Sequence, residues 1–192
     1  MSLLEKYILN IHLMSKESLN EITNLFVKKK YKAKEIICEI EKVPKKAFYL
    51  QKGIVKTYTF FTNGNEYIRR IYTKNIMFSS YTALIKNKKS IYNIECITDC
   101  TILEYDYAEL IKLADKNIEV SIFLRKGLEL LYMAYFNRNV EFLTKDATER
   151  YLNLLIQIPD IESYLNQKQI ASHIAITNVQ LSRLKKALKN KF

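Results

Sequence analysis

The chain has 192 residues, of which 48% are hydrophobic and 27% charged, a composition typical of a packed protein. Lysine and arginine number 31 against 20 acidic residues, so the formal net charge is +11 at neutral pH. With only three glycines and two prolines, the chain cannot be collagen-like and has no glycine-rich phosphate-binding loop. The positive excess favours a polyanionic partner.

No stretch reaches the roughly 18 apolar residues of a membrane span, and the first residues lack the pattern of a signal peptide. The three cysteines, Cys38, Cys96 and Cys100, are an odd number in a medium-sized chain, so we expect reduced thiols rather than a disulfide framework. These features predict a cytoplasmic protein that has no membrane partner.

The first half of the chain predicts a helix followed by a β domain. Residues 15–29 carry apolar side chains at helical spacing, and the lysines at 28–30 are expected at a solvated loop or helix end. From 35 to 106 the chain consists of short runs rich in Ile, Val, Tyr, Phe and Thr, with turn signals such as Asn63-Gly64-Asn65 between them. About six to eight such strands predict an antiparallel β-roll.

The next segment returns to helical periodicity, first briefly around Leu110 and then over 118–143. In the long helix, Leu124, Leu128, Leu131 and Tyr135 alternate steps of four and three residues, which is typical of a helix that pairs with a second copy of itself. Further apolar residues on other faces would pack on the β domain, namely Ile122, Phe123, Leu130 and Met133. An ordinary buried helix is the alternative interpretation.

A smaller helical domain is expected to follow. A helix over 144–158 ends at Pro159, and the segment 166–192 then holds six lysine or arginine residues and no acidic residue. This segment predicts a helix, a tight turn at Ala175-Ile176 and a second helix capped by Thr177. Leu181, Leu184 and Leu188 would face the core. The side chains left near the surface are Asn178, Val179, Gln180, Ser182, Arg183, Lys185, Lys186 and Lys189.

Such a second helix has the side chains that binding in the DNA major groove requires. Asn, Gln and Arg read base edges through paired hydrogen bonds, while lysines and a helix N-terminus neutralise phosphates. The sequence therefore predicts double-stranded DNA as the partner of a recognition helix over 177–189.

Residues 166–186 resemble the helix-turn-helix of the Crp/Fnr family of bacterial transcription regulators, through Q-K-Q-I-A at the start and L-S-R-L in the second helix. The run from Phe48 to Lys56 is similar to the family's strand-turn-strand. The resemblance implies an α+β fold. Its expected parts are an N-terminal antiparallel β-roll (a double-stranded β-helix, cyclic-nucleotide-binding-like) in 1–116, a dimerisation helix in 117–144, and a winged-helix-like helix-turn-helix domain in 145–192.

The resemblance also assigns roles by position. Asn178, Val179 and Arg183 occupy the family's base-contacting positions, and Lys168, Gln169 and Thr177 lie near its phosphate contacts. The implied protein is a homodimer that reads a two-fold-symmetric DNA site, with RNA polymerase as a further candidate partner.

Two departures from the family pattern bear on the DNA-binding domain. Ala175 stands where the family has a glycine, so we expect a strained or altered turn. The given sequence ends soon after the recognition helix, so we expect a C-terminal β-wing that is shortened or absent.

The effector pocket of the family is expected to be degenerate in this chain. Members that bind cyclic nucleotides use a Gly-Glu pair and, about ten residues later, an arginine for the phosphate. Ser79 and Ser80 stand at the first position and Ser90 at the second, beside Lys89, which offers a point charge without a bidentate fork. We predict that the protein does not depend on cyclic AMP; an unknown small-molecule effector is left open.

No metal, cofactor or catalytic site is expected. Cys96 and Cys100 lack enough further Cys or His for a four-ligand site, and His173 is expected at the surface. No nucleophile with a partner base is evident, which argues against an enzyme. The alternative to a transcription regulator is a non-enzymatic scaffold that resembles a cyclic nucleotide domain and acts through protein contacts or an unknown effector.

Overall fold

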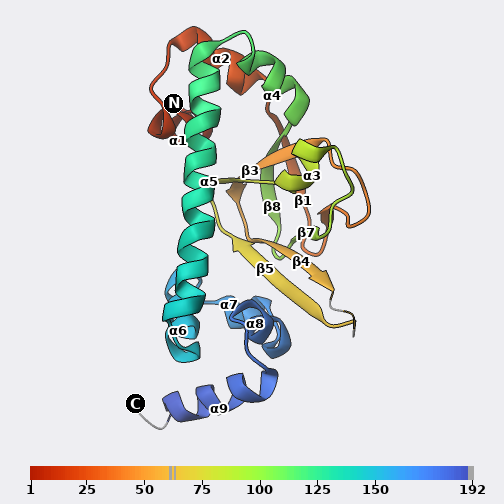
Figure 1. Cartoon of the computed structure of the whole chain (residues 1–192), viewed down its shortest axis with the longest axis vertical. Helices are drawn as coiled ribbons and strands as arrows, with labels where there is room; N and C mark the ends of the chain where they lie inside the picture. The colour runs from red at the N-terminus through yellow and green to blue at the C-terminus, as the bar shows by residue number, and fades with distance from the viewer. Residues whose placement is uncertain (61, 63, 190–192) are drawn as a thin grey trace. The chain divides into compact units, whose positions relative to one another are not determined.

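The computed structural model describes residues 1–60, 62 and 64–189, which divide into two compact units (Figure 1). The first unit comprises Met1–Thr57 and Ile71–Met133, and the second comprises Tyr58–Arg70 and Ala134–Phe192. The tip of one β-hairpin thus belongs to the same unit as the C-terminal helices. Among the described residues, no helix is both long and apolar enough to cross a membrane.

Eight strands of the described chain form two four-stranded sheets, in the orders β1-β8-β3-β6 and β2-β7-β4-β5. The pairs β1–β8, β2–β7, β3–β6 and β3–β8 are antiparallel. The strands are β1 (Val27–Tyr31), β2 (Ile36–Cys38), β3 (Lys46–Lys52), β4 (Val55–Phe60), β5 (Glu66–Tyr72), β6 (Ile76–Phe78), β7 (Asn93–Cys96) and β8 (Cys100–Asp106).

Strand β3 explains how one apolar run serves two cores. Phe48 and Leu50 belong to a cluster that also contains side chains of β4 and β6 to β8, whereas Ala47 and Tyr49 belong to a second cluster that includes helix residues. Because side chains alternate between the faces of a strand, a strand with helices on one face and a sheet on the other is apolar throughout.

Helices cover the outer face of this sheet in the first unit. They are α1 (Leu3–Ile11), α2 (Lys16–Asn24), α4 (Tyr107–Ala114) and the first half of α5 (Ile118–Thr144), while α3 (Tyr81–Lys86) follows β6. Ile8, Ile22, Leu110 and Phe123 are buried in the second cluster. The helix α1 begins with a reciprocal capping box between Ser2 and Glu5.

The fold class predicted from the sequence is confirmed, with local corrections. The helix expected over 15–29 ends at Asn24, and the lysines at 28–30 lie in the strand β1. Pairing of β1 with β8 decides the conformation of this polar segment, which local periodicity does not reveal. The elements α1, α3, β6 and α7 were not predicted. Asn63 of the expected hairpin turn lies outside the described residues.

Gly53 closes the turn between β3 and β4 in a backbone conformation with φ +105°. A Cβ atom at this position would lie 2.5 Å from Cys100 Sγ and 2.8 Å from the Asp99 carbonyl oxygen. The strand-turn-strand run that resembles the family motif therefore needs glycine both for its backbone and for space.

The second unit holds the end of α5 and the helices α6 (Ala147–Gln157), α7 (Ile161–Tyr164), α8 (Gln167–His173) and α9 (Asn178–Lys189). Capping boxes start α6 at Asp146 and α8 at Asn166. Between 145 and 189 the structure describes no strand. The core of these helices is formed by Tyr151, Leu154, Ile158, Ile161, Leu165, Ile170, Ala171, Ile174 and Leu181.

Candidate nucleic-acid interface

The turn between α8 and α9 is tight and carries one strained residue. Ala175 has φ +57°, and Ile176 N donates to the Ala171 carbonyl at 3.0 Å. Ala171, a small residue, is buried in α8, which packs against α9. A non-glycine residue in the left-handed region costs free energy, so the strain expected at Ala175 is present.

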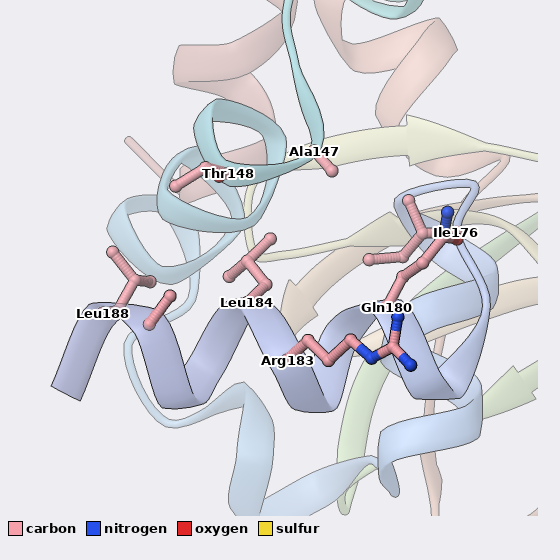
Figure 2. Close-up of a pocket in the computed structure, with 8 residues that line it drawn as sticks. Ala147, Thr148, Ile176, Gln180, Arg183, Leu184 and Leu188 are labelled. Carbon is pink, nitrogen blue, oxygen red and sulfur yellow. The ribbon is translucent and has the colours of Figure 1, made fainter. Parts of the chain in front are cut away.

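Helix α9 separates an apolar side from a polar side. Leu181 is fully buried, Leu184 and Leu188 are half-buried, and Arg183 is exposed. In Figure 2, Leu184 and Leu188 point from α9 toward α6, where they line a hollow of about 280 Å³, while Arg183 extends along α9 toward its N-terminal end. The exposed side carries Asn178, Val179, Gln180, Ser182, Arg183, Lys186 and Lys189.

Gln169, Thr177, Gln180 and Lys185, all predicted to contact DNA, also have partners within the chain. The side chain of Gln180 accepts from Thr177 N at 2.8 Å, and Gln169 makes the same kind of cap with Asn166. Lys185 Nζ lies 2.6 Å from Glu162 Oε1 and is half-buried. The two glutamines form capping boxes, which are a local pattern, whereas the pairing of Lys185 with Glu162 anchors α9 in a way that the local sequence does not predict.

Glu162 connects α9 to the helices behind it. It accepts hydrogen bonds from Lys185 and from the Tyr151 hydroxyl. These two hydrogen bonds, the Lys185 one foremost, lower the pKa of Glu162. The carboxylate therefore stays ionised and holds the orientation of α9 against α6 and α7.

Two arginines secure the carbonyl end of α8. Arg138 Nη2 donates to the His173 carbonyl at 3.1 Å, and Arg150 Nε donates to the Ile174 carbonyl at 3.0 Å. Both guanidinium groups lie over the Phe142 ring, at 4.8 and 5.4 Å from its centroid. Cations at the C-terminus of a helix are favourable because the last carbonyls there lack helical partners.

The expectation that His173 lies at the surface is wrong. The side chain is buried, and burial together with the neighbouring Arg138 lowers its pKa to about 3. The ring lies on α8 near the buried core residues Ile170 and Ile174. It is neutral because a charged ring in this buried position would lose its hydration.

The tip of the β4–β5 hairpin packs on α8, which the sequence does not reveal. Ile68 N donates to Ser172 Oγ at 2.9 Å, and Gln169 Nε2 donates to Glu66 at 3.2 Å. A groove of about 810 Å³ lies beside this contact. It is lined by Asn65, Glu66 and Tyr67 of the hairpin and, among others, by Lys168, Gln169, Thr177, Asn178 and Gln180.

The region predicted as a degenerate phosphate site is closed by its own side chains. Ser90 Oγ donates to the Tyr92 carbonyl at 2.6 Å and lies 2.8 Å from Ser80 Oγ, and both serines are buried. The Ser79 carbonyl accepts from the Tyr92 hydroxyl. Lys89 is exposed and forms an ion pair with Glu41 at 3.1 Å. Among the described residues of this region, therefore, no arginine is placed to bind a phosphate through two hydrogen bonds.

The cysteines are buried free thiols, as predicted. Burial and a hydrogen bond with Cys100 raise the pKa of Cys96, the hydrogen bond having the larger effect. The described part of the chain contains no group of three or more His, Cys, Asp or Glu residues that could hold a metal ion.

The predicted dimer-helix residues differ in exposure. Leu128 is exposed, whereas Leu124 packs on the second core cluster and Tyr135 accepts a hydrogen bond from Arg69 at 3.0 Å. Leu131 is half-buried. Leu130 and Met133, expected to pack on the β domain, are exposed. Beyond Ile118 at its start, the exposed large apolar residues of α5 are Leu128, Leu130, Tyr132, Met133, Phe136, Val140 and Leu143.

Comparison with known proteins agrees with this architecture. Residues 28–117 match the cyclic nucleotide-binding domain family. A search of curated protein sequences finds no match. The part of the chain that holds the two sheets is therefore similar to cyclic nucleotide-binding domains.

Solved structures extend the likeness to most of the chain. FixK2 from Bradyrhizobium japonicum has a TM-score of 0.70 at 17% identity, covering 86% of this chain and 85% of that one. A protein from Eubacterium rectale, described as a Crp/Fnr-family transcriptional regulator, has a TM-score of 0.73 at 14% identity, covering 93% and 85%. The catabolite activator protein of Thermus thermophilus has a TM-score of 0.59 at 14% identity, covering 94% and 86%. More narrowly, then, the chain has the fold of the Crp/Fnr transcription regulators.

Proposed function

We propose that this protein is a non-enzymatic, DNA-binding transcription regulator of the Crp/Fnr type. The observation that carries the proposal is the exposed surface of α9, where Asn178, Arg183 and Lys186 are exposed while Leu181 is buried, in a segment without acidic residues. An α-helix with this distribution fits the major groove and meets both base edges and phosphates. A DNA partner would place the protein in the cytoplasm.

The proposal divides the DNA-binding side chains by role. Asn178, Val179 and Arg183 read bases, while Lys168 and Lys186 neutralise phosphates. The residues that would act through the shape of the helix-turn-helix are Gln169, Thr177, Gln180 and Lys185, because each is engaged within the chain. Ser182, exposed on α9 between these groups, completes the surface that faces the DNA.

We further propose a homodimer that pairs through α5, with residues 1–116 as sensor domain, 117–144 as dimer helix and 145–192 as DNA-binding domain. Tyr132, Phe136 and Leu143 are 67%, 50% and 85% exposed, and they continue the face of Leu128 at helical spacing. The face predicted from the sequence, with Leu124, Leu128, Leu131 and Tyr135, lies next to this one, and Leu128 belongs to both. Two recognition helices about 34 Å apart would read half-sites one helical turn apart.

The sensor domain is proposed to act without cyclic AMP. The buried Ser80–Ser90 hydrogen bond occupies the positions at which a carboxylate and a guanidinium would bind the nucleotide. Isothermal titration of the protein with cyclic AMP should give no heat of binding. Micromolar binding that is lost on substitution of Ser90 would contradict this part of the proposal.

The first test is the selection of bound duplexes from a random pool at physiological salt, without added ligand. We expect an enriched inverted repeat, and light scattering should give a dimer that Phe136→Glu converts to a monomer. Salt-sensitive binding without an enriched sequence would instead favour the scaffold that acts through protein contacts.

Two single variants then test the division of roles. Arg183→Ala should cost roughly 1 to 3 kcal/mol and relax the preference at one base pair, because a bidentate contact to a base edge is lost. Lys186→Ala should weaken all sequences alike and reduce the salt slope by about one. Equal losses at every site with both variants would contradict the assignment.

A further inference from the structure

The end of α5, the helix α6 and the carbonyl end of α8 form a small polar hollow, which belongs to the second unit alone. Its volume is about 30 Å³, which leaves room for about two water molecules or one small ion. The residues that line it include Arg138, Glu141, Phe142, Arg150, Asn153 and Gln157. None of them belongs to α9, so the hollow is separate from the surface that is proposed to contact DNA.

Both arginines of the hollow hold the end of α8 with only part of their donors. Arg138 donates through Nη2 to the His173 carbonyl at 3.1 Å. Arg150 donates through Nε to the Ile174 carbonyl and through Nη1 to the Lys145 carbonyl. A guanidinium group has five N–H donors, so each arginine retains donors that these bonds do not use. In the part of the chain that the structure describes, no carboxylate oxygen lies within 4.0 Å of either group.

Further positive charge surrounds the hollow. Arg69 and Arg70 of β5 both lie over the Tyr135 ring of α5, at 5.1 Å from its centroid. Burial lowers the pKa of Arg138, and the charges of Arg70 and Arg69 act in the same direction. The charged form of Arg138 is therefore disfavoured in this environment, and an anion beside it would stabilise that form.

Glu141 compensates this charge only in part. Its carboxylate favours the charged form of Arg138. The same carboxylate also accepts from Asn153 Nδ2 at 3.0 Å and lies 3.5 Å from Lys145 Nζ. Because His173 is neutral, two arginines against one glutamate leave the lining with a net charge of +1.

The amide of Gln157 adds an uncharged donor. Gln157 lies one turn after Asn153 on α6 and lines the same hollow. Its side chain has no hydrogen-bond partner among the described residues, so its two N–H donors can serve a ligand. Guanidinium groups and an amide around so small a volume suit a small anion and exclude a nucleotide or another organic phosphate.

We propose that this hollow binds one small monovalent anion of the size of chloride. Arg138 and Arg150 hold the anion through charge-assisted hydrogen bonds, and the Gln157 amide is a third donor. The anion reduces the repulsion among the guanidinium groups and fixes the two arginines that secure the last carbonyls of α8. Its binding stabilises the second unit and does not depend on the proposed DNA-binding function.

Thermal unfolding of the full chain in sodium chloride and in sodium gluconate, at equal ionic strength, tests the proposal in solution. Gluconate is too large for the hollow, so the Tm of the wild-type protein should be about 2 to 4 °C higher in chloride, by a difference that saturates with concentration. Arg150→Gln should abolish this difference. Arg125→Gln is the matched control, since it removes the same charge from an exposed arginine of α5 that pairs with Glu129, and it should keep the full difference.

Gln157→Leu removes an uncharged donor and none of the described hydrogen bonds within the chain, so it should reduce the chloride difference while the protein still folds. This variant decides the test if Arg150→Gln does not fold. An equal difference in wild type and in all variants would indicate a general salt effect and would overturn the proposal. No difference in the wild-type protein would also overturn it, because the hollow would then contain only water.

Crystals of the wild-type protein grown in sodium bromide locate the ion, because bromide resembles chloride and scatters X-rays anomalously. We expect an anomalous peak within hydrogen-bonding distance of Arg138 and Arg150. Bromide peaks at other surface sites, with none in the hollow, would overturn the assignment even if chloride stabilises the protein.

Discussion

Two regions of this protein use the same kinds of polar side chain in opposite ways. In the β-roll, the hydroxyls of Ser80 and Ser90 are buried and bonded to one another. On α9, the side chains of Asn178 and Ser182 are exposed. In the first region the polar groups form hydrogen bonds with one another, and in the second they are exposed to solvent. Which of the two a polar residue does depends on burial, because a buried polar group without a partner is costly.

The same contrast applies to charge. In the β-roll, Glu104 is buried, and although burial acts in the other direction, hydrogen bonds from Lys46 and Tyr31 lower its pKa. The buried Lys56 forms a further ion pair, at 3.4 Å, with the half-buried Glu95. On α9, Arg183 and Lys186 are exposed. The number of lysines alone therefore does not mark the proposed DNA-binding surface, since several lysines of this chain form ion pairs with its own carboxylates.

The largest loss of stability is expected in the β-roll, for the variant Gly53→Ala. The added Cβ would meet Cys100 Sγ and the Asp99 carbonyl in a backbone conformation that alanine disfavours, so the variant should lose about 2 to 4 kcal/mol of unfolding free energy. Chemical unfolding followed by circular dichroism measures this loss. Gly64→Ala, where φ is +79° and nothing lies within 4 Å, should lose only about 1 kcal/mol. Equal losses would show that space around Gly53 is unimportant.

The pH dependence of the unfolding free energy tests whether His173 of α8 is as buried as the polar groups of the β-roll. Because the folded-state pKa of His173 is about 3, below the ordinary 6.5, the unfolded chain binds the proton first as the pH falls. The stabilising effect of the neutral ring is thus full above about pH 6.5 and is lost toward pH 3, by up to about 1.4 kcal/mol per pH unit. His173→Gln should have a shallower dependence in unfolding experiments between pH 7 and 4.5. Parallel curves for the two proteins would refute the burial of this ring.

A pair of serine variants addresses the comparison directly. Ser90→Ala should cost about 1 to 3 kcal/mol, because the Ser80 hydroxyl loses its buried partner. Ser182→Ala, on the exposed side of α9, should change stability by less than about 0.5 kcal/mol. Thermal unfolding of both variants measures the two losses of stability. A larger loss for Ser182→Ala than for Ser90→Ala would contradict the assignment of buried and exposed hydroxyls.

The smallest effect is expected in the turn of the helix-turn-helix. Ala175→Gly should raise the unfolding free energy by about 0.5 to 1 kcal/mol, since Ala175 is exposed and has φ +57°. Ala171→Gly, in the buried middle of α8, should lower it by about 1 kcal/mol or more. If Ala175→Gly is instead destabilising, the turn is not strained.

Much of the fold follows from local pattern. The runs rich in Ile, Val, Tyr, Phe and Thr predicted the strands β3 and β4, and the spacing of Leu181, Leu184 and Leu188 predicted the inner face of α9. The helix-turn-helix could be recognised because its caps, its small residue and its turn lie within one short segment. Each of these signals acts over a few residues, so the sequence displays it directly.

By itself the sequence determined the β-roll, the long helix and a basic last helix in a segment without acidic residues. Only the tertiary structure decided that Lys28 to Lys30 form a strand, that Lys185 pairs with Glu162, that His173 is buried, and that Glu66 reaches Gln169 across 103 positions of the chain. Hydrophobic periodicity specifies which face of an element is buried. The partner of a polar side chain is set by whichever distant element packs against it, and no local pattern encodes that.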